Sequence, residues 1–294
     1  FKGFTENSTR LVEARNALEK SFDKAYELYN RLLQLMVDLT NLQEIRLDNA
    51  KHKFLPTPDD LNPPMRFVEN SFINRLRQNA DFAVFNENNK QEWPDSDLLM
   101  RRLLDKILDS ELYAEYMAAE KSDYAADCEF WRKAFKYIIL PSEELAEALE
   151  SESVYWNDDL DIMGTFVVKT IKRFASSPDQ PVELLPKFKN DEDARFGAEL
   201  FSKSVAAYDT CREQIARFTS DTWDMERMAF MDVVILTAAI TEILNYPQIP
   251  VVVTINEYVE TANCYSTPKS GSFINGMLSN LVAAFRKEGL INKN

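Results

Sequence analysis

Apolar residues recur at helical spacing along most of the chain. In residues 20–47 the repeating positions are Phe22, Tyr26, Tyr29, Leu33, Met36 and Leu39. A spacing of three or four residues places such side chains on one face of a helix, and the residues between them are largely polar. Similar patterns predict helices over residues 66–80, 96–119, 129–140, 166–174, 191–218 and 228–244. The chain is therefore expected to be built from long amphipathic helices.

The positions of the prolines and the scarcity of alternating apolar and polar residues also favour helices over strands. Four prolines in "LPTPDDLNPP", residues 55–64, are expected to end the first long helix. The one short run that resembles a strand is "VVVT", residues 251–254. Thr254 and Glu257 form a T-x-x-E capping box, so we interpret that run as an extended entry into a helix. The predicted fold class is all-α.

Residues 266–282, "STPKSGSFINGMLSNLV", contain Gly271 and Gly276 within an otherwise amphipathic pattern. Each glycine inside a helix costs about 1 kcal/mol relative to alanine. Thr267 is the expected N-cap, with Pro268 at the first helical position. We expect Gly276 to allow close approach of a second helix. The apolar positions of this helix are Phe273, Met277 and Leu281.

Composition limits the class of protein. The 294 residues are 45% hydrophobic, which is typical of a globular protein. No apolar run approaches the roughly 20 residues that cross a bilayer. The cysteines, Cys128, Cys211 and Cys264, lie far apart, so we expect neither a disulfide framework nor a zinc site, and a cytoplasmic location. Because the chain starts at Phe1, we expect further residues to precede it.

Charge is distributed unevenly. The net charge is −14, of which residues 160–294 contribute −3 (14 basic, 17 acidic) and residues 1–159 contribute −11. With the change in composition near "YWNDDLDIMG", this difference predicts an acidic helical extension over residues 1–159 and a second domain over residues 160–294. In the second domain, Lys169, Lys172 and Arg173 share one predicted helix face. That face is either an ordinary solvated surface or a phosphate-binding patch.

Signatures of enzymes are scarce. His52 is the single histidine and lies in a polar stretch between two lysines, which favours a solvated position over a catalytic base. No glycine-rich phosphate loop, nucleophile elbow or HExxH motif is present. The sequence therefore predicts a protein without catalytic residues, metal ligands or cofactors.

Several motifs in the C-terminal half resemble a known family. "FINGMLSNL", residues 273–281, resembles the F-[IV]-N-G-x-L motif of the NusB family of transcription antitermination factors. "TWDMERMAFMDVVIL" is similar to the family's tryptophan, arginine and aspartate positions, here Trp223, Arg227 and Asp232. "EILNYPQIPVVVTINEYVE" is similar to a further pattern, here at Glu242, Pro250, Asn256, Glu257 and Glu260. Residues 1–159 resemble the extension of long Bacteroidetes-type members.

The resemblance implies two helical bundles and a role without catalysis. Family members pair with ribosomal protein NusE, and the two bind boxA RNA within the RNA polymerase antitermination complex. This suppresses premature termination, notably of ribosomal RNA transcripts. The family's arginine-rich N-terminal helix is not in this sequence. The acid surplus of residues 1–159 leads us to expect that RNA is bound elsewhere.

The resemblance and the charge pattern together select the candidate site residues. An exposed aromatic ring suits single-stranded RNA, which is held by stacking, and Phe273 matches the family's aromatic near RNA. The expected RNA-binding residues are Phe273, Lys269, Lys169, Lys172 and Arg173. The expected partner-binding residues are Asp232 and Glu257.

Two other hypotheses remain open at this point. One is a helical interaction module that keeps the fold and the NusE-type partner but does not bind RNA. The other is an enzyme that uses paired carboxylates, which the lack of histidine and of metal-ligand spacing disfavours. For Phe273 itself, a fully buried core position competes with a partly exposed one.

Overall fold

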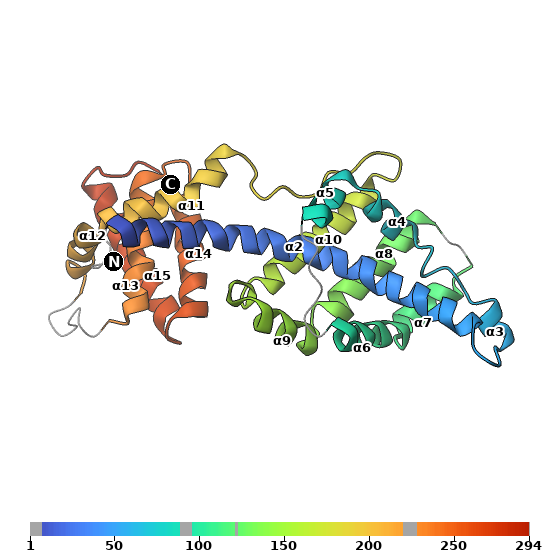
Figure 1. Ribbon diagram of the computed structural model, residues 1–294. Helices are drawn as coiled ribbons and strands as arrows, with labels where there is room; N and C mark the ends of the chain where they lie inside the picture. The colour runs from blue at the N-terminus through green and yellow to red at the C-terminus, as the bar shows by residue number, and fades with distance from the viewer. Residues whose placement is uncertain (1–7, 89–95, 121–122, 220–227, 294) are drawn as a thin grey trace. The chain divides into compact units, whose positions relative to one another are not determined.

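The computed structural model describes residues 8–88, 96–120, 123–219 and 228–293, and Figure 1 shows helices throughout these ranges. No strand occurs in them, which confirms the predicted all-α class. The N-terminal part consists of α2 (Ser8–Lys51), α3 (Pro58–Leu61), α4 (Ser71–Arg77), α5 (Ala80–Asn88), α6 (Ser96–Leu108), α7 (Glu111–Ala118), α8 (Tyr124–Ala134), η1 (Phe135–Ile139), α9 (Glu143–Glu152) and η2 (Val154–Trp156). The remaining helices are α10 (Leu160–Ser176), α11 (Asp191–Ala206), α12 (Tyr208–Ala216), α13 (Phe230–Asn245), α14 (Val251–Tyr265) and α15 (Ser270–Lys287).

The chain forms two compact units. Unit 1 contains residues 1–19 and 188–294, and unit 2 contains residues 20–187. Helix α10 therefore belongs to unit 2, where it packs against α8. The predicted domain boundary at residue 159 lies before this helix. That boundary divides the chain by composition and sequence resemblance, whereas the two units are divided by compact packing, so it stays a prediction.

Unit 2 has a core rich in aromatic side chains. The apolar face of α2 supplies Leu28, Leu32 and Met36, which have no exposed surface. Around them pack large rings from α2, α4, α5, α8, η1, η2 and α10 and from the connection before α4. The fully buried rings in this unit include Tyr29, Phe67, Phe72, Phe82, Trp131, Phe135, Trp156 and Phe174. Burial of such rings contributes a large part of the hydrophobic stabilisation of this unit.

Unit 1 has a mainly aliphatic core. Helix α13 is apolar on most sides, as its sequence predicts, and it packs against α11, α12, α14 and α15. Helices α14 and α15 share the most extensive contact in the chain. On α15 the predicted stripe is recovered, because Leu281 is fully buried and Met277 is nearly so, while Phe273 is half-buried.

Two long predicted helices are each divided. The helix expected over residues 96–119 breaks at Ser110, whose extended backbone and Oγ cap the start of α7 by accepting a bond from the N–H of Tyr113. The helix expected over residues 191–218 breaks at Ala207, between α11 and α12. In both places the apolar pattern continues across the break, so periodicity alone does not reveal it.

The predicted capping box at Thr254 is wrong. Helix α14 begins at Val251 with Pro250 as its N-cap, so "VVVT" is the first helical turn. Thr254 is fully buried inside the helix, and Glu257 is exposed on it. Pro250 fixes the entry of the chain instead, because its ring restricts φ and it has no N–H to leave unpaired.

Candidate nucleic-acid interface

The start of α15 presents a cation beside an aromatic ring. Lys269 is the N-cap residue of this helix and its side chain is exposed. One turn later, Phe273 donates its backbone N–H to the Lys269 carbonyl at 3.2 Å. The Phe273 ring packs partly against the core of unit 1 and is partly exposed, as expected from the motif. Lys269 and Phe273 therefore lie one helical turn apart at the start of α15.

A chain of hydrogen bonds holds this surface in place. The Ser266 hydroxyl donates to Oδ1 of Asp232 at 2.6 Å, and the Ser270 hydroxyl donates to the Ser266 oxygen at 3.1 Å. The Thr267 N–H donates to Ser270 Oγ at 3.1 Å. Asp232 is only 6% exposed, so its carboxylate ties the first turn of α13 to the loop before α15. Such buried and satisfied polar links favour a single loop conformation.

The predicted N-cap at Thr267 is wrong. Helix α15 begins at Ser270, and residues 267–269 form a turn in front of it. The Thr267 hydroxyl does not cap a helical N–H but lies 2.8 Å from the Ser270 hydroxyl. The Ser270 side chain bonds to Thr267 instead. Ser270 is fully buried, and its hydroxyl belongs to the chain of hydrogen bonds that ends at Asp232.

The two glycines of α15 have different surroundings. Gly271 is buried, and a Cβ built there would lie 2.0 Å from Oδ1 of Asn263 on α14. A Cβ at Gly276 would meet no atom within 4 Å. The expectation for Gly276 is therefore wrong, and the crowded glycine is Gly271, beside the Asn263 side chain. Absence of a side chain at Gly271 lets the Asn263 side chain, near the end of α14, lie against the first turn of α15.

The other predicted basic residues lie on α10 in unit 2. Lys169, Lys172 and Arg173 are all exposed, while the opposite face of the helix buries Ile171 and Phe174. The Lys169 ammonium lies 5.0 Å from the centre of the half-buried Phe166 ring. The three cations share a face, as their spacing predicts. They belong to unit 2, whereas Lys269 and Phe273 belong to unit 1.

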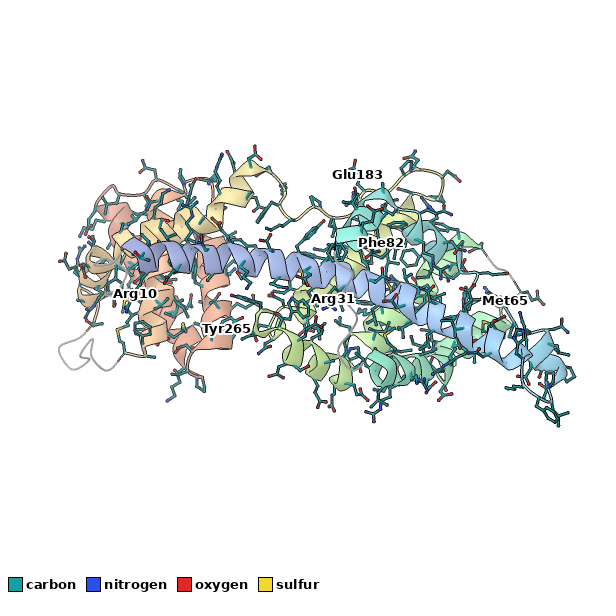
Figure 2. The ribbon with its side chains drawn as sticks, viewed as in Figure 1. Arg10, Arg31, Met65, Phe82, Glu183 and Tyr265 are labelled. Atoms are coloured by element: carbon teal, nitrogen blue, oxygen red, sulfur yellow. The ribbon has the colours of Figure 1, made fainter. Side chains whose placement is uncertain are left out.

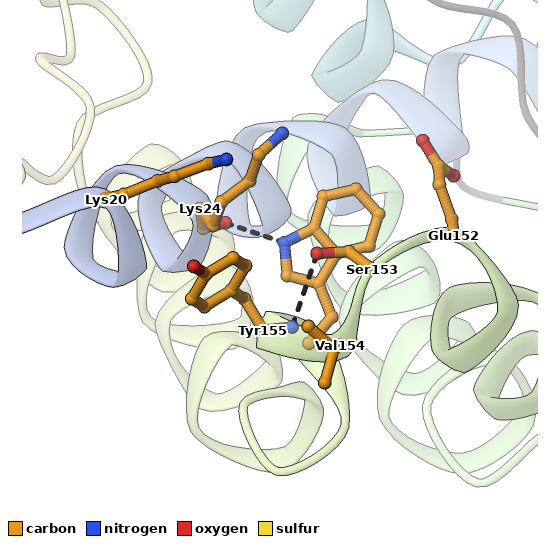
Figure 3. Close-up of a pocket in the computed structure, with 7 residues that line it drawn as sticks. Lys20, Lys24, Glu152, Ser153, Val154 and Tyr155 are labelled. Atoms are coloured by element: carbon orange, nitrogen blue, oxygen red, sulfur yellow. Dashed lines mark hydrogen bonds between the residues drawn. The ribbon is translucent and has the colours of Figure 1, made fainter. Parts of the chain in front are cut away.

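Unit 2 also has a hollow that the sequence did not reveal. It is about 600 Å³ in volume and is bounded by Lys20 and Lys24 of α2 and by residues 152–156 (Figure 3). Lys20 lies 5.8 Å from the centre of the Tyr155 ring. The Trp156 indole N–H donates to the Lys24 carbonyl at 2.8 Å. The two segments are about 130 residues apart in the sequence, so no local motif marks this hollow.

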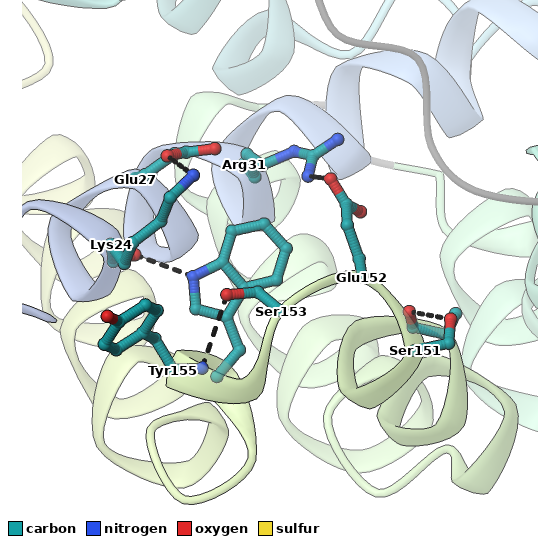
Figure 4. A network of polar contacts seen from close by, with 9 residues as sticks. Lys24, Glu27, Arg31, Ser151, Glu152, Ser153 and Tyr155 are labelled. Carbon is teal, nitrogen blue, oxygen red and sulfur yellow. Dashed lines mark hydrogen bonds and ion pairs between the residues drawn. The ribbon is translucent and has the colours of Figure 1, made fainter.

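Most charged side chains around this hollow form ion pairs with one another or with a neighbouring residue. Lys24 pairs with Glu27 at 2.6 Å, and Arg31 pairs with Glu152 across to α9 (Figure 4). The Arg31 guanidinium also lies 5.1 Å from the centre of the Trp156 ring. Arg31 is nearly buried, and the pair and the ring compensate for the loss of water around its charge. These contacts indicate a structural joint between α2 and α9.

The predicted partner-binding residues differ in exposure. Glu257 is exposed on α14, whereas the Asp232 carboxylate is buried against Ser266. Glu242, another motif position, is buried and accepts a bond from the Tyr258 hydroxyl at 3.0 Å. Burial, together with the nearby Glu242 carboxylate, raises the pKa of Tyr258. The motif positions Trp223 and Arg227 lie outside the described residues.

The described ranges contain neither a metal-binding cluster nor a membrane-spanning helix. There, no group of three or more His, Cys, Asp or Glu side chains is placed to hold a metal ion. None of the helices in those ranges combines the length and apolar character of a membrane span.

Comparison with known proteins identifies the family. The NusB family model matches residues 159–283. The transcription antitermination protein NusB of Salinibacter ruber is 31% identical over 118 residues, which cover 39% of this chain and 73% of that protein. The chain belongs to the NusB family.

Further relatives agree with this assignment. The NusB protein of Dictyoglomus thermophilum is 36% identical over 33% of this chain and 70% of its own length, and that of Thermodesulfovibrio yellowstonii is 39% identical over 32% and 61%. No solved structure matches the chain. The matched part contains both candidate surfaces, on α10 and at the start of α15. These matches confirm the expected family. NusB proteins are transcription antitermination factors and not enzymes.

Proposed function

We propose that this protein is a transcription antitermination factor that binds boxA RNA together with ribosomal protein NusE. In this role it suppresses premature termination by RNA polymerase, notably on ribosomal RNA transcripts. Membership of the NusB family supports the general role. The observation that carries the RNA-binding part is the half-buried ring of Phe273 beside the exposed Lys269.

This pair has the chemistry that single-stranded RNA requires. A base stacks on an aromatic ring, and a cation within the same surface neutralises a neighbouring phosphate. Phe273 is anchored in the core on one side, so its ring loses little freedom when a base stacks on the other. The bonds from Asp232 through Ser266 to Ser270 hold the loop that carries Lys269. A surface arranged before binding has less ordering entropy to lose.

The basic face of α10 extends the proposed RNA contact. Lys169, Lys172 and Arg173 lie on an exposed face, and no ion pair joins them to an acid within the described ranges. Cations without such partners remain available to phosphates, and each phosphate contact adds to the salt dependence of binding.

The proposed surface for NusE lies on α13 and α14. Glu257 is exposed there and is suited to meet a basic partner surface. The same two helices also carry exposed apolar side chains, namely Phe230, Leu244, Val252 and Val253. A mixture of apolar anchors and peripheral charge is typical of protein interfaces. Asp232 acts in this proposal by holding the loop before α15, since its carboxylate is buried.

Phe273→Ala tests the RNA contact. Stacking on one base is worth about 1–3 kcal/mol, so the affinity for boxA RNA should fall by roughly fivefold to a hundredfold. Because Phe273 is only half-buried, its removal should cost less stability than the about 3–5 kcal/mol of a fully buried phenylalanine. Fluorescence anisotropy with labelled boxA RNA and NusE, and thermal unfolding of the same samples, measure both effects.

Companion variants separate the possible outcomes. Lys269→Ala should reduce the slope of log affinity against log salt by about one. Glu257→Arg should weaken NusE binding in the absence of RNA. If the unaltered protein binds NusE but no boxA RNA, it is an interaction module without RNA binding. Equal RNA affinity of Phe273→Ala and the parent would remove Phe273 from the site.

A further inference from the structure

A second hollow in unit 2 lies beside the basic face of α10. Its volume is about 460 Å³, and its boundary includes Lys172, Arg173 and Ser176 of α10 together with Pro181 and Glu183 of the following loop. Both cations and the Glu183 carboxylate are exposed to solvent. Nevertheless, no ion pair joins Glu183 to either cation in the described part of the chain. The hollow therefore presents separate positive and negative groups.

The loop that forms one wall is anchored along its whole length. The Arg75 guanidinium of α4 donates to the carbonyls of Ser177 at 2.9 Å and Gln180 at 2.6 Å. The Asn79 side chain donates to the Val182 carbonyl at 2.5 Å. The Leu184 N–H donates to Oδ2 of Asp81 at 3.1 Å. Figure 2 shows Glu183 on this loop, near Phe82 of α5.

These anchors give the loop a fixed shape. A connection without regular structure normally has a mobile backbone, because its polar groups bond only to water. Here side chains from about 100 residues earlier satisfy the backbone on both sides of Glu183. The backbone at Glu183 is thus held at a constant position relative to the end of α10. An anchored backbone limits the positions that the carboxylate can reach, which lowers the entropy that it loses when a ligand binds.

We propose that this hollow binds one nucleotide of single-stranded RNA and prefers guanosine. Lys172 and Arg173 hold the flanking phosphates, and Pro181 covers one side of the base. Glu183 accepts hydrogen bonds from the edge of the base. This assignment rests on the proposed RNA-binding function and adds to it a site and a base preference.

The carboxylate explains the preference. A negative group repels phosphate, so it benefits an RNA site only where it accepts hydrogen bonds from a base or from a ribose 2′-OH, and of these only a bond from a base gives a base preference. The pairing edge of guanine offers two adjacent donors, N1–H and the 2-amino group, which match the two carboxylate oxygens. Uracil offers a single N–H there. Adenine and cytosine offer an amino group next to a ring nitrogen that is itself an acceptor and repels the carboxylate.

The inference also assigns a role to the N-terminal helices. Arg75, Asn79 and Asp81 do not touch RNA in this arrangement but position the loop that carries Glu183. The acidic part of the chain would then shape an RNA site without binding phosphate. This role agrees with its surplus of negative charge.

The test compares three RNAs that differ at one nucleotide. Each RNA consists of a boxA element followed by an oligouridine segment. One position of that segment is guanosine, inosine or uridine. Inosine retains N1–H and lacks the 2-amino group. With the full chain and NusE, the guanosine RNA should bind roughly tenfold more tightly than the uridine RNA, as expected for a bidentate base contact, and inosine should be intermediate. Glu183→Gln should abolish this order.

Four further variants test the other parts of the site. Lys172→Ala and Arg173→Ala should weaken all three RNAs equally, each reducing the salt slope by about one. Arg75→Ala should speed hydrogen exchange of the Val182 and Leu184 amides and reduce the guanosine preference, and Arg75→Lys should restore part of both. Circular dichroism and thermal unfolding check that each variant remains folded.

The outcomes separate this inference from the proposed function. If no RNA containing boxA binds, the proposed RNA-binding function fails. If boxA RNA binds and its affinity depends on Phe273, but the guanosine, inosine and uridine RNAs bind with equal affinity, only the guanosine site is overturned. A guanosine preference that survives Glu183→Gln would likewise overturn the assignment of the carboxylate.

Discussion

The surface on α15 and the surface on α10 are held in place by contacts of different range. In unit 1, Ser266, Thr267 and Ser270 bond to one another within five residues, and one bond to Asp232 links them to α13. In unit 2, the loop after α10 depends on bonds to Arg75 and Asn79, about 100 residues away. The first surface is therefore marked by a local motif. The cations of the second also follow from local spacing, but the hollow beside them exists only after distant helices have packed.

The comparison extends to the helices themselves. Helix α10 carries its cations opposite a fully buried aromatic ring, Phe174, which makes edge contact with Phe72. Helix α15 places Phe273 at the margin of an aliphatic core, where the ring is partly exposed. In unit 2 the aromatic residue is therefore buried under the helix that carries the proposed surface. In unit 1 the aromatic residue is itself part of the proposed surface.

Phe174→Ala should have the largest effect. Removal of this fully buried ring should lower the free energy of unfolding of unit 2 by about 3–5 kcal/mol, because the transfer energy is lost and a cavity remains. Urea unfolding followed by circular dichroism measures the change, with Phe273→Ala as the matched variant in unit 1. Equal losses in the two variants would contradict the distinction between a supporting ring and a surface ring.

Asp232→Ala should have the next largest effect. It leaves the part-buried hydroxyl of Ser266 without its acceptor, which should cost about 1–3 kcal/mol of stability. It should also speed hydrogen exchange at Thr267 and Ser270. Glu257→Ala is the control, and as an exposed substitution it should change stability by less than about 0.5 kcal/mol. Unchanged exchange in Asp232→Ala would show that the loop does not depend on the carboxylate.

The two glycines of α15 provide a smaller and sharper comparison. Gly276→Ala should stabilise unit 1 by about 0.5–1 kcal/mol, because the position is open and alanine is the better helix former. Gly271→Ala should be less stable than Gly276→Ala by about 1 kcal/mol, since its methyl group displaces the Asn263 side chain. Adding Asn263→Ala should recover part of that difference, which thermal unfolding of the double variant measures.

The loss of two exposed ion pairs of unit 2 in acid should produce the smallest effect. Lys53 lowers the pKa of Asp60 to about 2, and Lys106 lowers the pKa of Glu144 to about 2. A carboxyl with a lowered pKa in the folded state stabilises that state above its unfolded pKa of about 4. This contribution should disappear as the pH falls from about 4 towards 2. Both groups are fully exposed, so the change should be small.

Asp60→Asn and Glu144→Gln provide the measurement. Urea unfolding at pH 7 and pH 2 should show that each variant loses less stability on acidification than the parent protein. The Asp60 pair links Lys53, just after α2, to α3, whose N-cap Thr57 also bonds to this carboxylate. An identical loss of stability in parent and variants would mean that neither pair contributes to folding.

Much of the fold follows from the order of the residues. The apolar spacing on α2, α13 and α15 predicts helices that the structure contains, because burying one face of a helix is a local property of its sequence. The motif around Phe273 likewise indicates an aromatic at the start of the last helix. Its partial exposure, which the motif suggested but did not decide, depends on how far the core of unit 1 reaches.

Tertiary structure decided the rest. Whether Gly271 or Gly276 lies against a neighbouring helix depends on where Asn263 falls, and helical period cannot supply that. The break at Ser110 depends on a competition between continuing a helix and capping a new one, with similar energies. The hollow at Glu183 requires Arg75 and Asn79 to reach the backbone of a loop that is distant in sequence. Local sequence determines which face of a helix is apolar, but long-range packing determines which polar groups meet beside it.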